Sequence, residues 1–99
     1  MLGEAIRIAR VFQGITQQDL ANAMNVSSGF LSQIESGARQ PSQETLRSAA
    51  VALGVPASSL IFFSEQMQAR EGVSEAEARI RFGRKILSVM AQIDRASDE

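Results

Sequence analysis

The sequence predicts an all-α protein in which five short helices are followed by a longer C-terminal helix. Apolar residues recur at helical spacing, and hydroxyl residues stand where helix caps are expected. The first 63 residues contain no apolar–polar alternation of the kind that indicates a strand. A chain of 99 residues suffices for one small core and an appended element. We therefore expect a first domain over residues 1–63 and a C-terminal helical segment over residues 64–99.

The first two expected helices are separated by a short break at Gly14. The first covers residues 4–12, and its apolar stripe consists of Ala5, Ile8, Ala9 and Phe12. Thr16 stands as the cap of the second helix, with Asp19 three positions later in the place of the usual Glu or Gln of a capping box. This helix should end at about Met24.

The third helix should follow after a tight turn. Asn25 suits the turn because Asn tolerates the left-handed backbone conformation better than other non-glycine residues. Ser27 is a suitable cap, Gly37 ends the helix, and Pro41 follows at the usual distance. Leu31 and Ile34 are expected in the core, whereas Phe30 could lie in the core or at a contact surface. The opposite face is small, polar and uncharged, and consists of Ser28, Gly29, Ser32 and Gln33.

Two more helices complete the expected first domain. Ser42 caps the fourth, Gly54 closes it, and its core-facing stripe consists of Leu46, Ala49, Ala50 and Leu53. Pro56 suits the first turn of a fifth helix that reaches about Phe63. The polar segment 64–72 either extends this helix or forms a sixth.

The C-terminal helix should begin at Ser74, which forms an S-x-x-E capping box with Glu77, and continue to about Ala96. Residues 79–85 include four cations, which favour the polar face of an amphipathic helix over the alternative of a basic patch that contacts nucleic acid. The helix also carries a wide apolar surface that the first domain does not need to complete its own core. We expect this surface to form a dimer interface made of Ile80, Phe82, Ile86, Leu87, Val89, Met90 and Ile93.

Composition limits the chemistry that the chain can perform. It contains neither cysteine nor histidine, which excludes disulfides, thiolate metal sites and a Ser-His-Asp triad. The sequence shows no phosphate-binding glycine loop and no paired catalytic carboxylates, so we expect no enzyme, no metal and no cofactor. No apolar run is long enough to cross a membrane and no signal peptide is visible, so a cytoplasmic protein is expected.

Charge is the property least favourable to nucleic-acid binding. The net charge is -1, whereas phosphate neutralisation normally requires a basic face. Backbone N–H groups and helix N-termini can also bind phosphates. A neutral monomer would bind DNA weakly, so we expect two copies to act together.

A family resemblance follows from the motifs between Ile15 and Ser42. The order T-Q-Q-x-L-A, then V-S, then S-G-F-L-S-Q-I-E-S-G, then P-S resembles the helix-turn-helix domain of phage repressors and Xre-type bacterial regulators. The resemblance covers residues 2–63 and implies the five-helix DNA-binding fold of that family. It also implies a sequence-specific transcriptional regulator, a repressor, that binds double-stranded DNA. We infer a homodimer from the apolar surface after Ser74 and from the low charge, so the operator should be near-palindromic. Two recognition helices would then lie roughly 34 Å apart, one DNA turn.

The resemblance assigns DNA-contacting roles to two groups of residues. The base-contacting group would consist of Ser28, Gly29, Ser32 and Gln33. The phosphate-contacting group would consist of Gln17, Ser27, Ser36 and Arg39. Gln33 is the clearest reader, since an amide can bond adenine through N6 and N7 together. Arg39 is the only cation in the motif, so its replacement should weaken binding to all sequences alike. The alternative for these residues is an ordinary solvated position on a helix or loop.

The resemblance also implies a structural ion pair between Arg10 and Glu35. The alternatives for Arg10 are a phosphate contact or a solvated side chain. A rival function remains open, in which an antitoxin-like regulator uses its C-terminal helices to bind a second protein. A helix-turn-helix scaffold that has lost DNA binding is more distant. The long helix could also fold back onto its own first domain.

Overall fold

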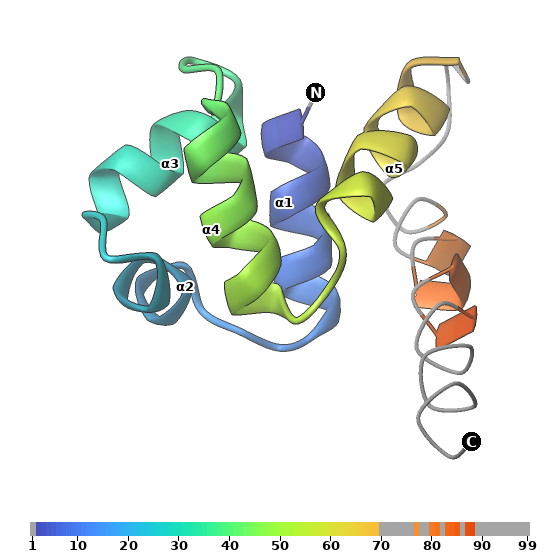
Figure 1. The fold of residues 1–99 in the computed structure, drawn as a ribbon, viewed down its shortest axis with the longest axis horizontal. Coiled ribbons are helices and arrows are strands. Elements are labelled where there is room, and N and C mark those ends of the chain that lie inside the picture. Colours follow the sequence, from blue (N-terminus) through green and yellow to red (C-terminus); the bar gives the residue numbers. More distant parts are fainter. Residues whose placement is uncertain (1, 70–76, 78–79, 82, 86, 89–99) are drawn as a thin grey trace.

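A computed structural model describes residues 2–69, 77, 80–81, 83–85 and 87–88 of the chain (Figure 1). All regular secondary structure in this described part is helical, which confirms the predicted all-α fold class. The helices are α1 (Leu2–Phe12), α2 (Gln17–Met24), α3 (Ser28–Ser36), α4 (Gln43–Leu53) and α5 (Ala57–Ala69). The described residues between 77 and 88 are helical as well.

Side-chain caps and left-handed residues fix the ends of the middle helices. The hydroxyl groups of Thr16, Ser27 and Ser42 each accept a hydrogen bond from the backbone N–H three residues later. Each bond satisfies one of the N–H groups that a helix start leaves unpaired. Asn25 and Gly54 end α2 and α4 in the left-handed conformation. These local devices determine where the helices begin and end.

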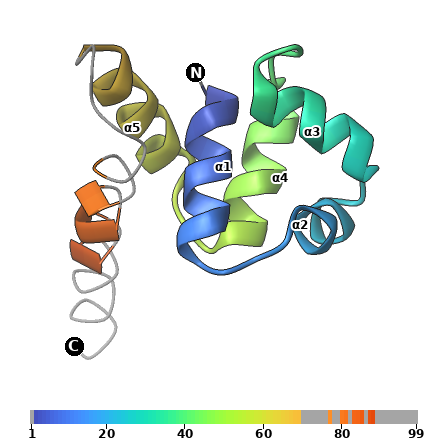
Figure 2. The same ribbon diagram turned by 180° about the vertical axis from the view of Figure 1, so that it is seen from behind.

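The core lies where α1 and α4 meet the other helices. α1 packs against α3 and α5, while α2 packs against α3 and α4. Figures 1 and 2 show α1 and α4 between α5 on one side and the α2–α3 pair on the other. The largest fully buried side chains are Ile6, Ile8, Leu20, Leu31, Ile34 and Leu60. The same core therefore supports both α3 and α5.

The fifth helix follows one of the two expected alternatives, in which the residues after 63 extend it. It continues through residue 63, where we placed the domain boundary, and reaches Ala69, so the segment after residue 63 begins as an extension of α5. Ser64 is buried beside the core residues Leu60 and Phe63, which explains why the helix does not stop at that point. The first turn of the extension thus belongs to the packed domain.

No single helix among the described residues has the length and apolar character needed to cross a membrane. Only α4 and part of α5 taken together pass that test, and a bend of 103° separates them.

Candidate nucleic-acid interface

The α2–turn–α3 unit is built from short-range contacts. Thr16 Oγ1 accepts a hydrogen bond from the Asp19 N–H at 3.1 Å, and Ser27 Oγ accepts one from the Phe30 N–H at 3.0 Å. Asn25 lies between the two helices with φ 59° and ψ 43°. Its left-handed conformation reverses the chain within a few residues, so that α3 follows α2 directly. The sequence therefore encodes the angle between these helices locally.

Arg10 connects α1 to both ends of this unit. Its guanidinium donates to Glu35 twice, from Nε to Oε2 at 2.8 Å and from Nη2 to Oε1 at 3.0 Å. Nη1 donates to the carbonyl oxygen of Ile15 at 2.9 Å. The exposed fractions of the Arg10 and Glu35 side chains are 13% and 3%. The two charges are thus paired in a largely buried site. The two parallel hydrogen bonds stabilise the pair and also fix the orientation of both side chains.

Gln17 joins this network from the first turn of α2. Its Nε2 donates to Glu35 Oε1 at 3.1 Å, and its side chain is half-buried. The amide NH₂ group carries two N–H donors, so one bond to Glu35 leaves the second N–H for a phosphate. The structure therefore gives Gln17 a role in positioning that the sequence did not indicate. Its phosphate contact stays a prediction.

Gly3 is a further structural residue that sequence reasoning missed. A Cβ at this position would overlap the carbonyl oxygen of Ile34, so α1 and α3 approach each other too closely for any side chain. No sequence signal marked it, because the first helix was expected to begin at residue 4, whereas α1 begins at Leu2. We call Gly3, Arg10, Gln17 and Glu35 the inner anchor, because together they fix α3 from its buried side.

The opposite side of α3 is open. All four predicted base-contacting residues are exposed, and we call this group the recognition face: Ser28, Gly29, Ser32 and Gln33. Three of the predicted phosphate-contacting residues, Ser27, Ser36 and Arg39, are exposed as well. The structure thus brings the predicted residues to the outer side of one helix and its flanking turns, with only Gln17 drawn partly inward.

The loop after α3 is tied back to the recognition face. The Arg39 N–H donates to the Gln33 carbonyl oxygen at 3.1 Å, and Arg39 Nε donates to the Gln33 side-chain oxygen at 3.2 Å. The guanidinium carbon lies 5.2 Å from the centroid of the Phe30 ring. Phe30 is half-buried against the core, so its ring gives the Arg39 side chain a packed surface to rest on. Ser36 Oγ donates to the same Gln33 carbonyl at 3.1 Å.

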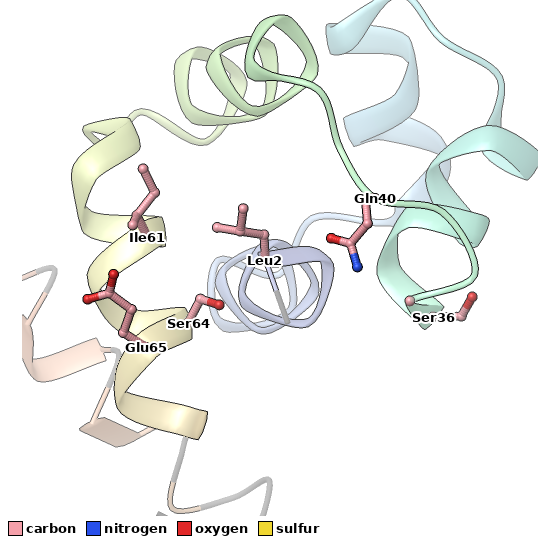
Figure 3. Close-up of a pocket in the computed structure, with 7 residues that line it drawn as sticks. Leu2, Ser36, Gln40, Ile61, Ser64 and Glu65 are labelled. Atoms are coloured by element: carbon pink, nitrogen blue, oxygen red, sulfur yellow. The ribbon is translucent and has the colours of Figure 1, made fainter. Parts of the chain in front are cut away.

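A groove of about 560 Å³ lies beside this loop. Figure 3 shows Leu2 between Ile61, Ser64 and Glu65 of α5 on one side and Ser36 and Gln40 on the other. The groove lies between α5 and the loop after α3, and α1 lies between the helices α3 and α5 (Figures 1 and 2).

The described part of the C-terminal segment packs against its own first domain. Gly83 is buried, and a Cβ there would overlap the Phe12 ring. Lys85 Nζ lies 5.1 Å from the centroid of the Phe62 ring. Ile80 and Leu87, two of the predicted dimerisation residues, are 57% and 62% exposed. The other five lie outside the described residues: Phe82, Ile86, Val89, Met90 and Ile93.

Within the described ranges, no group of three or more His, Cys, Asp or Glu residues is arranged to hold a metal ion.

Comparisons with known proteins agree with this arrangement. A model of the helix-turn-helix family matches residues 6–60. The transcriptional regulator ClgR of Mycobacterium tuberculosis, in strains CDC 1551 and H37Rv, is 35% identical over 71 residues. The aligned part makes up 72% of this chain and 63% of those relatives, so the chain spans less than two thirds of their length.

Solved structures of similar proteins extend the comparison. Two are described as the clp gene regulator ClgR of Corynebacterium glutamicum, and both give a TM-score of 0.60. One is 39% identical and covers 62% of this chain and 79% of that chain. The other is 31% identical and covers 97% of this chain and 83% of that chain. The likeness thus extends beyond the first domain.

Proposed function

We propose that this chain, which belongs to the helix-turn-helix family of transcription regulators, binds a specific DNA sequence. It would repress transcription by occupying promoter DNA. The family is one of regulators and not of enzymes, in agreement with the composition. The observation that carries the proposal is the contrast across α3. Its buried side is fixed by the inner anchor, while its recognition face is exposed, small and uncharged.

Docking of α3 in the major groove follows from this contrast. A recognition helix contacts base edges mainly with its N-terminal residues, which here are Ser28, Gly29 and Ser32. Small side chains allow the helix to approach the bases closely. Ser27, Ser36 and Arg39 flank this face and would contact the phosphates, which fix the register of the protein on the duplex. Gln17 would donate its remaining N–H to a phosphate at the start of α2.

We propose that two copies bind a near-palindromic operator. One copy offers only Arg39 as a cation in the motif, and phosphate contacts supply much of DNA affinity. Ile80 and Leu87 support self-association, because large apolar side chains are exposed on the same helical segment. A homodimer through this segment would double the number of phosphate contacts and mirror the symmetry of the operator.

Selection of bound duplexes from random DNA tests the proposal. We expect enrichment of one motif with two inverted half-sites, and enrichment of no sequence would refute sequence-specific binding. The solved relatives are named as clp gene regulators, so clp promoters are the first natural DNA to assay. In a reporter with the selected site across the promoter, the protein should lower expression. Raised expression would refute repression and leave DNA binding intact.

Sedimentation of a matched pair of variants tests the dimer. Leu87→Asp should convert the protein to monomers and weaken operator binding, because a charge in an apolar interface is costly. Val51→Asp is the control, since Val51 is 82% exposed on α4, outside the proposed interface. A Leu87→Asp protein that remained a dimer, or a wild-type protein that was monomeric at micromolar concentration, would contradict the arrangement.

The antitoxin-like function is the second candidate, and the same exposed residues favour it. If the C-terminal segment binds a second protein, that protein should co-purify with the chain and be lost on Leu87→Asp substitution. Self-association in the absence of any second protein would favour the homodimer.

A further inference from the structure

We infer that Arg39 is a positioning residue for Gln33, and that Gln33 consequently reads guanine in the major groove. This inference rests on the proposed DNA binding and concerns which base the recognition face prefers. Without the structure, Gln33 is expected to read adenine and Arg39 to contact only phosphate. The contacts between the two side chains change both expectations.

Arg39 is attached to Gln33 and its helix at three points. Its backbone N–H donates to the Gln33 carbonyl oxygen at 3.1 Å, and its Nε donates to Gln33 Oε1 at 3.2 Å. Its guanidinium carbon lies 5.2 Å from the centroid of the Phe30 ring, within the range of a cation–π contact. Phe30 packs against the core, so the guanidinium has a fixed support. The bond to Gln33 therefore belongs to a supported arrangement.

The direction of the Gln33 amide follows from hydrogen-bond chemistry. A guanidinium has donors and no acceptor, so it can bond only the oxygen of the amide and never its nitrogen. The carbonyl is thus directed at the loop, and the NH₂ group with its two N–H donors remains for DNA. Because the donor in this bond is charged, it is stronger than a neutral amide contact.

This orientation selects among the base edges of the major groove. Adenine is read by an amide that turns both its carbonyl and its NH₂ group to the same base edge, accepting from N6 and donating to N7. The bond from Arg39 uses one lone pair of the Gln33 carbonyl oxygen and draws that oxygen toward the loop, which disfavours this arrangement. Guanine presents two acceptors, N7 and O6, which suit the two N–H donors of the amide. Adenine would place its N6 donor against the NH₂ group. The other N–H groups of Arg39 remain available for a phosphate. Arg39 would then contact the DNA backbone and, through Gln33, also determine which base is preferred.

The test is a competition assay on the selected operator, with each of the four bases placed in turn at the position whose preference Gln33→Ala abolishes. The wild-type protein should prefer guanine over adenine there by about tenfold or more. Arg39→Ala should weaken binding overall and also reduce this preference to less than about threefold, or reverse it toward adenine, because the carbonyl is released.

Two controls separate positioning from loss of charge. Arg47→Ala removes one exposed cation from α4 and should leave the guanine preference unchanged. Arg39→Ala introduced into the Gln33→Ala protein should lower affinity without any further change at this base. Because Arg39 and Gln33 are both exposed, the variants should melt at the wild-type temperature, which excludes misfolding as the cause.

The outcomes distinguish this inference from the function on which it rests. A wild-type preference for adenine, or an Arg39→Ala protein that keeps the full guanine preference, would overturn the inference while sequence-specific binding stood. A selection that enriched no sequence would refute the proposed function itself.

Discussion

The two sides of α3 are built in opposite ways. On the buried side, Glu35 is 5% exposed and is held by Arg10 and Gln17, while Gly3 lets α1 approach the helix closely. The outer side carries the recognition face, which is exposed and contacts little besides its own loop. The residues that hold α3 in place are therefore separate from those that we propose to contact DNA.

This separation gives each side its own pattern of mutational effects. Changes in the inner anchor should lower the free energy of unfolding and weaken binding to all DNA equally, because they affect how much correctly folded protein is present. Changes in the recognition face should leave folding intact and alter which DNA is bound.

The largest effect should come from breaking the buried ion pair. Glu35→Gln leaves the Arg10 guanidinium without a counter-charge in a site where it is only 13% exposed. Arg10→Met leaves the buried Glu35 carboxylate without its counter-charge. Removing one partner of a buried pair costs about 3 to 5 kcal/mol. Thermal or urea unfolding of both variants would measure this loss, and unchanged midpoints in both would show that the pair does not stabilise the fold.

A second large effect should come from the close approach of α1 and α3. Gly3→Ala places a methyl group against the backbone of Ile34, which cannot move without shifting α3. Overpacking of this kind costs about 1 to 3 kcal/mol. Gly29→Ala is the matched control on the outer side of α3, because nothing lies within 4 Å of the added Cβ. Equal unfolding midpoints for wild type and Gly3→Ala would contradict the proposed close contact.

Ser27 lies at the boundary between the two sides and should separate folding from binding. Ser27→Ala removes the hydroxyl that accepts from the Phe30 N–H, at a cost of about 1 kcal/mol. Ser27→Asp keeps a good cap and adds a negative charge where a phosphate is expected. We expect near wild-type stability and strongly reduced DNA binding for the Asp variant. Wild-type affinity in Ser27→Asp would rule out a phosphate at this position.

The smallest effect on folding should come from Gly29→Ala, with the opposite sign. Alanine in a helix is favoured over glycine by about 0.5 to 1 kcal/mol, so unfolding should require slightly more denaturant. The added methyl group should nevertheless weaken binding to the selected operator, since it enlarges the face that approaches the bases. If operator affinity were unchanged, Gly29 would not lie at the DNA surface.

Local features of the fold could be predicted from the sequence, because their causes lie within a few residues. The caps at Thr16, Ser27 and Ser42 and the left-handed Asn25 are examples. The end of α5 was harder to predict, because no glycine or proline follows residue 63 before Gly72. The buried Ser64 shows that the helix continues to pack against the domain beyond residue 63.

Contacts between distant residues account for what the sequence did not reveal. Gly3 meets Ile34 across 31 positions, and no local pattern shows how closely two helices approach. The same holds for the bond from Gln17 to Glu35, and for the bond from Arg39 to Gln33, which depends on the path of a loop. The Arg10–Glu35 pair was expected only because of the family resemblance. The charge of Arg10 alone is equally compatible with a phosphate contact.

The most direct test of sequence-specific binding through α3 is an NMR titration of isotope-labelled protein with a duplex carrying the selected operator. If α3 carries this binding, backbone amide shifts should change most over residues 27–33 and 36–40 and at the start of α2, while amides of α4 stay nearly unchanged. Changes centred on α5 and the groove beside Leu2, with α3 unaffected, would contradict it.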